Sequence, residues 1–133
     1  MHTIAHGIDL TDIPRISQML QKHGQHFLDR CFTPTEQELA SKGMTARRDE
    51  FLAGRFAAKE AVLKALGTGI SEGINWTDVE VLRIGNGKPK VILHNMAADL
   101  AAEQGIQDVL ISISHIKSHA MASAIAIGSS APN

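Results

Sequence analysis

The first elements that the hydrophobic pattern predicts are a strand and a helix. Along residues 3–10 the large apolar side chains take one face of a strand, and the other face carries Ala5, Gly7 and Asp9. Asp12 and Pro14 then supply a cap and a first-turn proline for a helix. The predicted buried stripe of that helix consists of Ile13, Ile16, Leu20 and Phe27.

The rest of the chain alternates helical and strand patterns. A short helix is predicted from Thr33 to near Gly43, and the longest helix covers residues 46–66 and ends at Gly67, before a glycine-containing loop that reaches Gly73. Four strands (77–84, 90–93, 109–115 and 120–127) form two hairpins, separated by a helix at 96–104 that ends at Gly105. This order predicts an α+β fold, with an antiparallel sheet packed against one long and several shorter helices.

Composition fits one soluble domain spanning residues 1–133. Hydrophobic residues make up 44% of the chain and charged residues 20%, which excludes disorder. Aromatics are only 4% and the net charge is −1, which argues against nucleic acid as a partner. Cys31 has no disulfide partner, and no apolar run approaches the roughly 20 residues that span a membrane. With no signal-peptide pattern at the N-terminus, we expect a cytoplasmic protein.

Positive charge is concentrated within and just before the long helix. Residues 42–64 hold six Lys and Arg side chains (Lys42, Arg47, Arg48, Arg55, Lys59 and Lys64) against three acidic ones (Asp49, Glu50 and Glu60). This local excess indicates where an anionic ligand would bind.

One face of the long helix combines charge with small side chains. Phe56, Glu60 and Lys64 recur every four residues, which places Glu60 and Lys64 about 6 Å apart along the axis. Alanines at 53, 57 and 61 flank them and allow something to approach the backbone closely. A surface ion pair is the ordinary interpretation. If Asp9 meets Glu60 across the fold, the two carboxylates suit Mg²⁺, which binds one or two carboxylates together with water and substrate phosphates.

Several motifs together resemble a known family. In chain order they are Gly7-Ile8-Asp9-Leu10, the helical run from Ala53 to Gly69 (AGRFAAKEAVLKALGTG), Gly87-Lys88-Pro89 and Ile113-Ser114-His115. The chain resembles the 4′-phosphopantetheinyl transferases, specifically the bacterial holo-acyl carrier protein synthases, from about Thr3 to Ile127. The long helical motif is highly specific, and the shorter pieces gain weight from lying in register with it.

The resemblance implies an activity in fatty acid biosynthesis. Such transferases move 4′-phosphopantetheine from coenzyme A to a serine of apo acyl carrier protein and release adenosine 3′,5′-bisphosphate. Asp9 and Glu60 match the family's magnesium ligands, and Lys64 matches its pyrophosphate-contacting lysine. Arg55 would lie near the nucleotide, and Gly87, Lys88, Pro89 and His115 near the adenosine 3′-phosphate. The family is usually a homotrimer that binds coenzyme A between subunits, so one site can draw on two chains.

The chemistry of diphosphate displacement agrees with these roles. The reaction needs neutralised phosphoryl oxygens and an in-line nucleophile. Lys64 would offset negative charge, and the sequence leaves open whether a metal-activated water or Glu60 takes the serine proton. No covalent enzyme intermediate is required. Ser114 and His115 are neighbours on a predicted strand, so their side chains point to opposite faces and form no catalytic dyad.

A second surface lies on the first helix. Arg15, Met19 and Lys22 share a face away from the buried stripe. Such a face is ordinarily a solvated one, but in this family it resembles the surface that receives the acidic recognition helix of the carrier protein. Two further hypotheses remain at this stage: a coenzyme A or nucleotide-binding module without catalysis, and a purely structural interaction domain.

Overall fold

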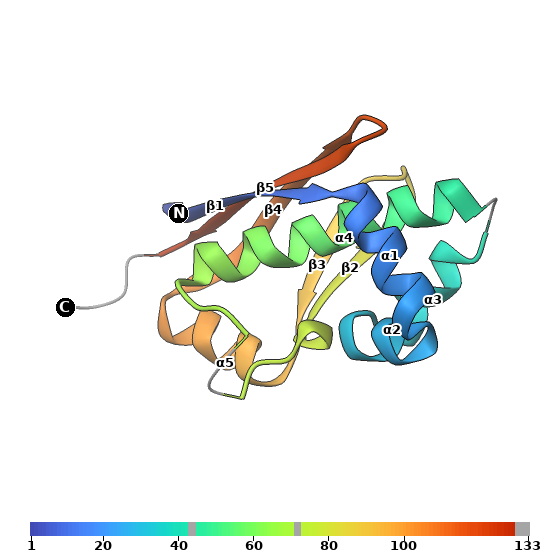
Figure 1. Ribbon diagram of the computed structural model, residues 1–133. Coiled ribbons are helices and arrows are strands. Elements are labelled where there is room, and N and C mark those ends of the chain that lie inside the picture. Colours follow the sequence, from blue (N-terminus) through green and yellow to red (C-terminus); the bar gives the residue numbers. More distant parts are fainter. Residues whose placement is uncertain (43–44, 71–72, 130–133) are drawn as a thin grey trace.

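The structure, a computed structural model, describes residues 1–42, 45–70 and 73–129 and has the predicted α+β architecture (Figure 1). The strands are β1 (His2–Asp12), β2 (Val79–Arg83), β3 (Pro89–Leu93), β4 (Ile106–His115) and β5 (His119–Gly128). The helices are α1 (Ile13–His23), α2 (Gln25–Cys31), α3 (Pro34–Ala40), α4 (Thr45–Leu66) and α5 (Asn95–Glu103), with a 3₁₀ turn at Trp76–Asp78. The predicted helix end near Gly43 and part of the predicted loop between Gly67 and Gly73 lie outside the described residues.

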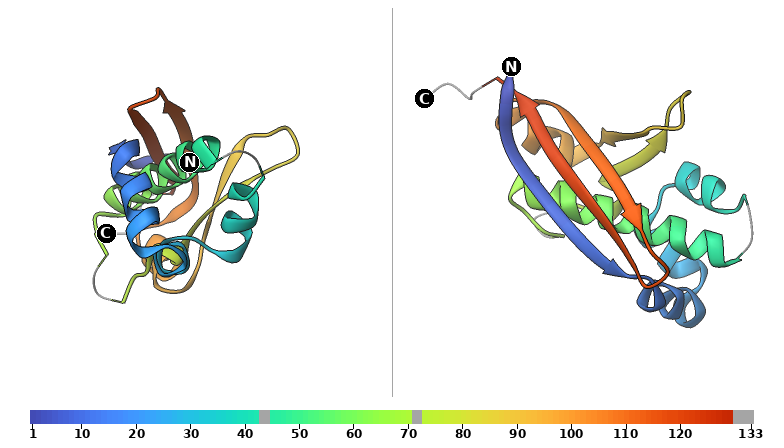
Figure 2. Two further views of the ribbon diagram at one scale, coloured as in Figure 1. Left: turned by 45° about the vertical axis from the view of Figure 1, so that its right-hand side comes forward. Right: turned by 90° about the horizontal axis from the view of Figure 1, so that it is seen from above.

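Helix α4 packs against an antiparallel sheet with the strand order β1-β5-β4 (Figure 2). The inner face of β5 carries only small side chains, Ala120, Ala122, Ala124 and Ala126, all of them at most 1% exposed. A Cβ added at Gly7 of β1 would stand 2.1 Å from the backbone oxygen of Ala61. The small residues predicted along α4 therefore admit the protein's own strand, which lies against the helix backbone.

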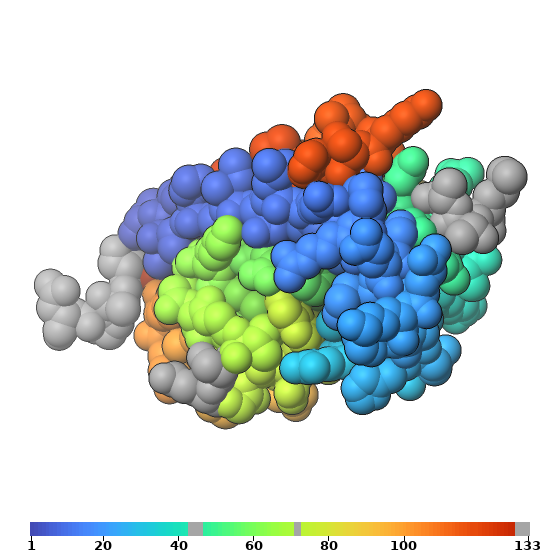
Figure 3. Space-filling model, viewed as in Figure 1, coloured from blue at the N-terminus to red at the C-terminus, as the bar shows by residue number. Residues whose placement is uncertain are grey.

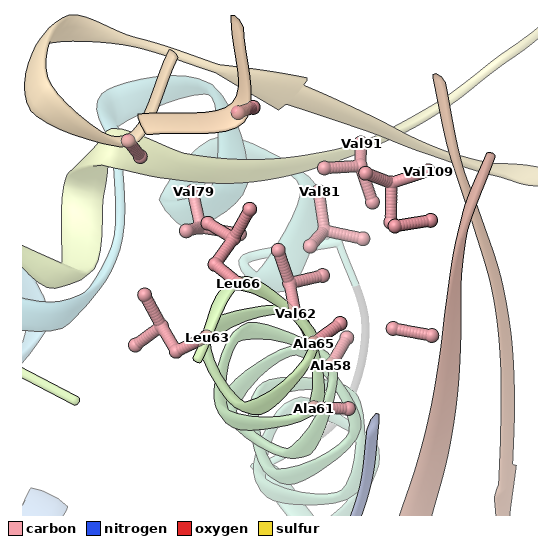
Figure 4. Packing of buried hydrophobic residues seen from close by; sticks show 14 of the residues in the cluster. Ala58, Ala61, Val62, Leu63, Ala65, Leu66, Val79, Val81, Val91 and Val109 are labelled. Carbon is pink, nitrogen blue, oxygen red and sulfur yellow. The ribbon is translucent and has the colours of Figure 1, made fainter. Parts of the chain in front are cut away.

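A two-stranded sheet, β2-β3, covers another side of α4. Val79, Val81 and Val91 of this hairpin point toward Val62 and Leu66 of the helix in Figure 4. All five residues are at most 9% exposed. Because α4 packs against both sheets, its orientation is fixed on two sides. Side chains on the helix surface between these two contacts therefore project in defined directions.

The charge of Lys59 suggested a role in an anion-binding surface, but the side chain is fully buried and takes no part in such a surface. Its Nζ donates a hydrogen bond of 2.8 Å to Glu36 Oε1 and others to the backbone oxygens of Trp76 and Val79. Glu36 Oε2 also accepts a 2.8 Å bond from the backbone nitrogen of Val81. Because a buried charge is tolerated only when paired and hydrogen-bonded, Lys59 serves to join α3, α4 and β2.

Three element boundaries differ from the sequence prediction. Gly24, with φ of +52°, ends α1, so the predicted continuous stripe through Phe27 is divided between α1 and α2. The predicted strand at 77–84 begins with a 3₁₀ turn, and only Val79–Arg83 pair with β3. Strand β4 begins at Ile106 instead of 109, because Ile106 still pairs with Gly128 of β5.

The faces of β1 are reversed relative to what hydrophobicity alone favours. Ile8 is 50% exposed and Leu10 65% exposed, whereas Gly7 on the opposite face is buried. Close packing against α4 requires small side chains, so Ile8 and Leu10 lie on the outer face of the sheet, whereas Ile4, beside the register shift between Thr3 and Ala5, packs against the core. None of the helices in the described part of the chain combines the length and apolar character needed to cross a membrane.

Candidate active site

Asp9 is held at the inner face of β1 by two neighbouring groups. Lys64 Nζ lies 3.2 Å from Asp9 Oδ1 and donates a 3.0 Å hydrogen bond to the backbone oxygen of Ile8. Thr11 Oγ1 donates a 2.8 Å bond to Asp9 Oδ2. Lys64 therefore pairs with Asp9 across the fold and does not form the surface ion pair with Glu60 that the helical spacing suggested.

Glu60 lies one turn before Lys64 on α4 and faces the same cavity as Asp9. This cavity, of about 300 Å³, is lined by Asp9, Thr11, Phe56 and Glu60 among others. Burial raises the pKa of Glu60, the charge of Asp9 raises it further, and Lys64 and Arg15 oppose the change. The strand and the helix thus bring together the two carboxylates whose convergence the sequence left as a hypothesis. In Figure 3 the blue surface of β1 lies directly against the green surface of the central part of the chain.

The chemistry of this cavity fits a magnesium ion better than a transition metal. Asp9 and Glu60 offer hard oxygen ligands, and the described residues hold no cluster of three or more His, Cys, Asp or Glu side chains. Mg²⁺ keeps several waters and uses one or two carboxylates with substrate phosphates, whereas structural zinc needs four nitrogen or sulfur ligands. Two carboxylates that repel each other would also gain from a shared cation.

The predicted docking face of α1 opens onto this cavity. Arg15 and Met19 both line it, together with Asp9 and Glu60. Lys22 is exposed one turn further along the helix and is outside the cavity lining. A macromolecule resting on α1 would therefore have direct access to the two carboxylates.

A second, larger cavity lies between α4, the β2–β3 hairpin and β4. Its volume is about 810 Å³, and it contains the five nucleotide-site residues predicted in this region: Arg55, Gly87, Lys88, Pro89 and His115. Lys64, predicted to contact the same ligand, does not line it. The predicted glycine-rich turn is a hairpin turn, with Gly87 at φ of +84°, and it also forms one wall of the cavity.

Arg55 is the least satisfied polar side chain of this cavity. The residue is 6% exposed, its guanidinium lies 4.1 Å from the centre of the Phe51 ring, and within the described structure its Nε has no hydrogen-bond partner. Burial lowers the pKa of Arg55 to about 10, and the charge of Arg83 contributes to this. A buried donor without a partner is costly, so an anionic ligand that accepted from Arg55 would gain affinity there.

The two cavities lie on different sides of α4. Arg55 and Glu60 are five residues apart, which corresponds to about 140° around a helix, and Phe51 and Glu60 are separated by about 180°. The first cavity adjoins β1 and the second adjoins β4, which are the two edges of the three-stranded sheet. The predicted site residues therefore form two separate groups within one chain.

Thr11 and Arg83 are among the site residues that were not predicted from the sequence. Thr11, whose hydroxyl donates to Asp9, lies two positions further along the same strand. Because side chains two apart share a strand face, this spacing could have identified Thr11 as a neighbour of Asp9. Arg83 lines the second cavity and pairs in register with Pro89. Its position opposite the Gly-Lys-Pro turn follows from hairpin register, which the sequence pattern placed only approximately.

The chain matches known proteins over almost its whole length. Residues 5–124 match the family model of the 4′-phosphopantetheinyl transferase superfamily. A holo-[acyl-carrier-protein] synthase of Alkaliphilus oremlandii is 50% identical over 121 residues, covering 91% of this chain and 96% of the relative. A Bacillus anthracis holo-(acyl-carrier-protein) synthase crystallised with CoA (3′,5′-ADP) has a TM-score of 0.80 at 36% identity, covering 97% and 100% of the two chains.

A second solved structure agrees. The holo-[acyl-carrier-protein] synthase of Helicobacter pylori in complex with coenzyme A has a TM-score of 0.80 at 30% identity, and the match covers 92% of this chain and 99% of that one. The family resemblance and the fold class inferred from the sequence are both confirmed.

Proposed function

The chain belongs to the holo-acyl carrier protein synthase family of 4′-phosphopantetheinyl transferases, and from this premise we propose how it works. It transfers 4′-phosphopantetheine from coenzyme A to a serine of apo acyl carrier protein in a magnesium-dependent reaction and releases adenosine 3′,5′-bisphosphate. We place this activity in fatty acid biosynthesis in the cytoplasm. The observation that carries the proposal is the shared cavity of Asp9 and Glu60, with Lys64 3.2 Å from Asp9.

Asp9 and Glu60 are the residues that would hold Mg²⁺. When bound, the ion supplies positive charge against the diphosphate oxygens of coenzyme A. Thr11 fixes the carboxylate of Asp9 from one side and Lys64 contacts it from the other, so Asp9 is oriented before any ligand arrives. Lys64 is half exposed, so its ammonium group can shift from Asp9 to the diphosphate, and a cation on Asp9 would then keep the mostly buried carboxylate paired.

We propose direct transfer without a covalent enzyme intermediate. Among the described residues that line it, the only side-chain hydroxyl belongs to Thr11, which donates to Asp9, and there is no cysteine. In this proposal the carrier serine is the nucleophile, and the enzyme contributes positioning and charge stabilisation.

The nucleotide half of coenzyme A belongs in the second cavity. Five Lys and Arg side chains and His115 line it, which suits the 3′-phosphate and the diphosphate, and Arg55 has an unused donor. Because the two cavities lie on different sides of α4, we assign them to one ligand bound between neighbouring copies of the chain. One copy supplies the nucleotide cavity and the next supplies Asp9, Glu60 and Lys64.

A homotrimer provides this arrangement. A heterologous contact that closes on itself produces a ring in which every site receives both halves. The outer face of the three-stranded sheet exposes large apolar side chains in β1, β4 and β5, namely Ile8, Leu10, Leu110, Met121 and Ile125. Packing these faces together would bring the β4 edge of one copy beside the β1 edge of the next and remove apolar surface from water.

We assign carrier-protein docking to α1. Arg15 and Lys22 are exposed cations on either side of the half-buried Met19, and Arg15 and Met19 open onto the first cavity. An acidic helix seated there would deliver its adjoining serine toward Asp9 and Glu60.

A transfer assay tests the function. The protein is incubated with coenzyme A, Mg²⁺ and apo carrier protein, and the carrier is weighed by mass spectrometry. We expect a phosphopantetheine mass gain that requires Mg²⁺, and a Glu60→Gln variant that loses at least 100-fold in rate while it still binds coenzyme A. Transfer by Glu60→Gln at the wild-type rate would favour a role for this cavity in binding alone.

A further inference from the structure

One acidic side chain stands out in the nucleotide cavity. Glu50 of α4 lines it together with the cations Arg47, Arg55, Arg83, Lys88 and Lys90. The other acid there, Asp108, accepts a 2.9 Å hydrogen bond from the backbone nitrogen of Val109. A carboxylate in a cavity for an anionic ligand repels that ligand unless it acts through another group.

The described partner of Glu50 is His115, at the end of β4. Glu50 Oε2 lies 3.7 Å from His115 Nδ1, and the side chains are 33% and 47% exposed. The pair connects α4 to the sheet edge at the mouth of the cavity. Because the two ring nitrogens point in different directions, contact at Nδ1 leaves Nε2 available to a ligand, and within the described residues Nε2 has no hydrogen bond.

We propose that Glu50 is a positioning residue for recognition of the 3′-phosphate, an inference that rests on the proposed function of this cavity. In the complex the ring carries a proton on each nitrogen: the negative carboxylate, 3.7 Å from Nδ1, attracts Nδ1–H, and Nε2–H donates to a phosphate oxygen. An imidazole that donates from both nitrogens carries a proton, so binding of the 3′-phosphate draws one proton into the complex.

The other charged groups of the cavity come from three elements. Arg47 and Arg55 on α4, and Arg83, Lys88 and Lys90 on the β2–β3 hairpin, are its cations, and Asp108 on β4 is its other acid. The strand paired with β4 places the uncharged Ala120 opposite His115. In this mainly cationic surrounding, Glu50 is the acid closest to the ring, so it is the group that we assign to hold the imidazole in position.

Calorimetry with two ligands tests the inference. Adenosine 3′,5′-bisphosphate and adenosine 5′-monophosphate differ only in the 3′-phosphate, and at about pH 8 the phosphates are fully ionised while free imidazole is mostly neutral. Titrations in two buffers of different ionisation enthalpy report the protons taken up. We expect proton uptake with the bisphosphate and much less with the monophosphate.

The variant Glu50→Gln separates positioning from simple charge. We expect it to bind the bisphosphate about 3- to 5-fold more weakly, a modest loss because both side chains are partly exposed, and to bind the monophosphate unchanged with proton uptake reduced. Glu50→Gln in a His115→Ala background should cost nothing further. Glu38→Gln, an exposed glutamate on α3, is the matched control and should bind both ligands as the wild type does.

Different results would overturn the role of Glu50 and the assignment of the cavity to the nucleotide. If Glu50→Gln binds the bisphosphate as tightly as the wild type, or more tightly, Glu50 only repels the ligand and the inference is wrong. If His115→Ala still weakens binding in that case, the nucleotide cavity itself stands. If neither His115→Ala nor Arg55→Ala changes binding of either ligand, the assignment of the cavity to the nucleotide fails.

Discussion

At the level of single residues, the first cavity holds two acids, Asp9 and Glu60, and Glu60 is the less stabilised of the two. Its pKa is raised by burial and by Asp9, and the nearby cations compensate only in part. Asp9, in contrast, receives a hydrogen bond from Thr11 and an ion pair from Lys64. Such an arrangement costs stability in the empty protein and is typical of a site that awaits a cation.

Removal of this charge should stabilise the protein while it stops the reaction. Because the folded-state pKa of Glu60 is raised, the native state binds more protons than the unfolded state between the two pKa values, and the free energy of unfolding falls as pH rises through that window. Glu60→Gln should therefore unfold about 1–3 °C higher at pH 7 in EDTA, a small gain because Glu60 is only partly buried.

The advantage of Glu60→Gln should shrink as pH falls toward 4 and disappear at about pH 3, where the glutamate is neutral in both states. Differential scanning fluorimetry across this pH range measures it, with Glu103→Gln on the exposed end of α5 as control. A lower melting temperature for Glu60→Gln at pH 7 would show that the carboxylate is stabilised in the empty site.

At the level of elements, the contact between β1 and α4 sets the geometry of the site. Glu60 and Lys64 share a helix face, so their spacing was predictable from the sequence. Their relation to Asp9 was not, since it depends on how closely β1 approaches the helix. Gly7 and Ala61 determine that approach, and the sequence showed only that both are small. The family motifs supplied the link that periodicity lacked.

Gly7→Ala tests this approach. The added methyl group would lie 2.1 Å from the Ala61 oxygen and 2.8 Å from the Ala65 nitrogen, both backbone atoms that cannot yield cheaply. We expect a loss of about 3 kcal/mol in the free energy of unfolding by urea denaturation, and reduced transfer activity under conditions where the variant is still folded.

Gly85→Ala is the control for this change, because its Cβ would meet nothing within 4 Å and its φ is not positive. Equal stability of the Gly7→Ala and Gly85→Ala variants would contradict close packing of β1 on α4.

Helix α1 makes a separate prediction about the carrier protein. Lys22 is exposed on the docking face and outside the cavity lining, so its charge can affect docking without touching the reacting groups. Lys22→Glu should raise KM for apo carrier protein about 5- to 20-fold at low salt, with less effect at high salt and no change in coenzyme A affinity.

Steady-state kinetics at two salt concentrations measure this effect. Arg30→Glu reverses an exposed charge on α2, away from the docking face, and should leave KM as it is. The docking assignment fails if Lys22→Glu and Arg30→Glu have the same KM as the wild type.

At the level of the whole molecule, the sequence predicted the α+β class and the two hairpins, because each depends on local pattern. The family resemblance implied that one site can draw on two chains, but the sequence pattern did not show that the site residues separate into two groups on different sides of α4. That separation follows from the contacts of α4 with β1, β4 and the β2–β3 hairpin, which no local pattern specifies. The sequence pattern also placed Ile8 and Leu10 on one strand face, but it did not indicate that this face is the exposed one.

The proposed assembly makes coenzyme A binding depend on oligomeric state. Ile125 is 37% exposed on the outer face of β5, the central strand of the three-stranded sheet. Ile125→Glu should convert the trimer to monomers in light scattering and weaken coenzyme A binding at least 10-fold, because each chain then keeps only half of a site.

Met96→Glu, which also replaces an exposed apolar side chain but on α5, is the control and should keep the trimer. A fully monomeric Ile125→Glu variant with unchanged coenzyme A affinity would show that one chain holds the complete site.

The central claim is that Asp9 and Glu60 bind the same divalent ion. Titration with Mn²⁺ in the presence of coenzyme A, followed by electron paramagnetic resonance, tests this claim most directly. We predict one bound ion per chain in the wild type and in the exposed α5 variant Asp99→Asn, and at least 10-fold weaker binding in both Asp9→Asn and Glu60→Gln. Wild-type affinity for the ion in either of these two variants would contradict the account.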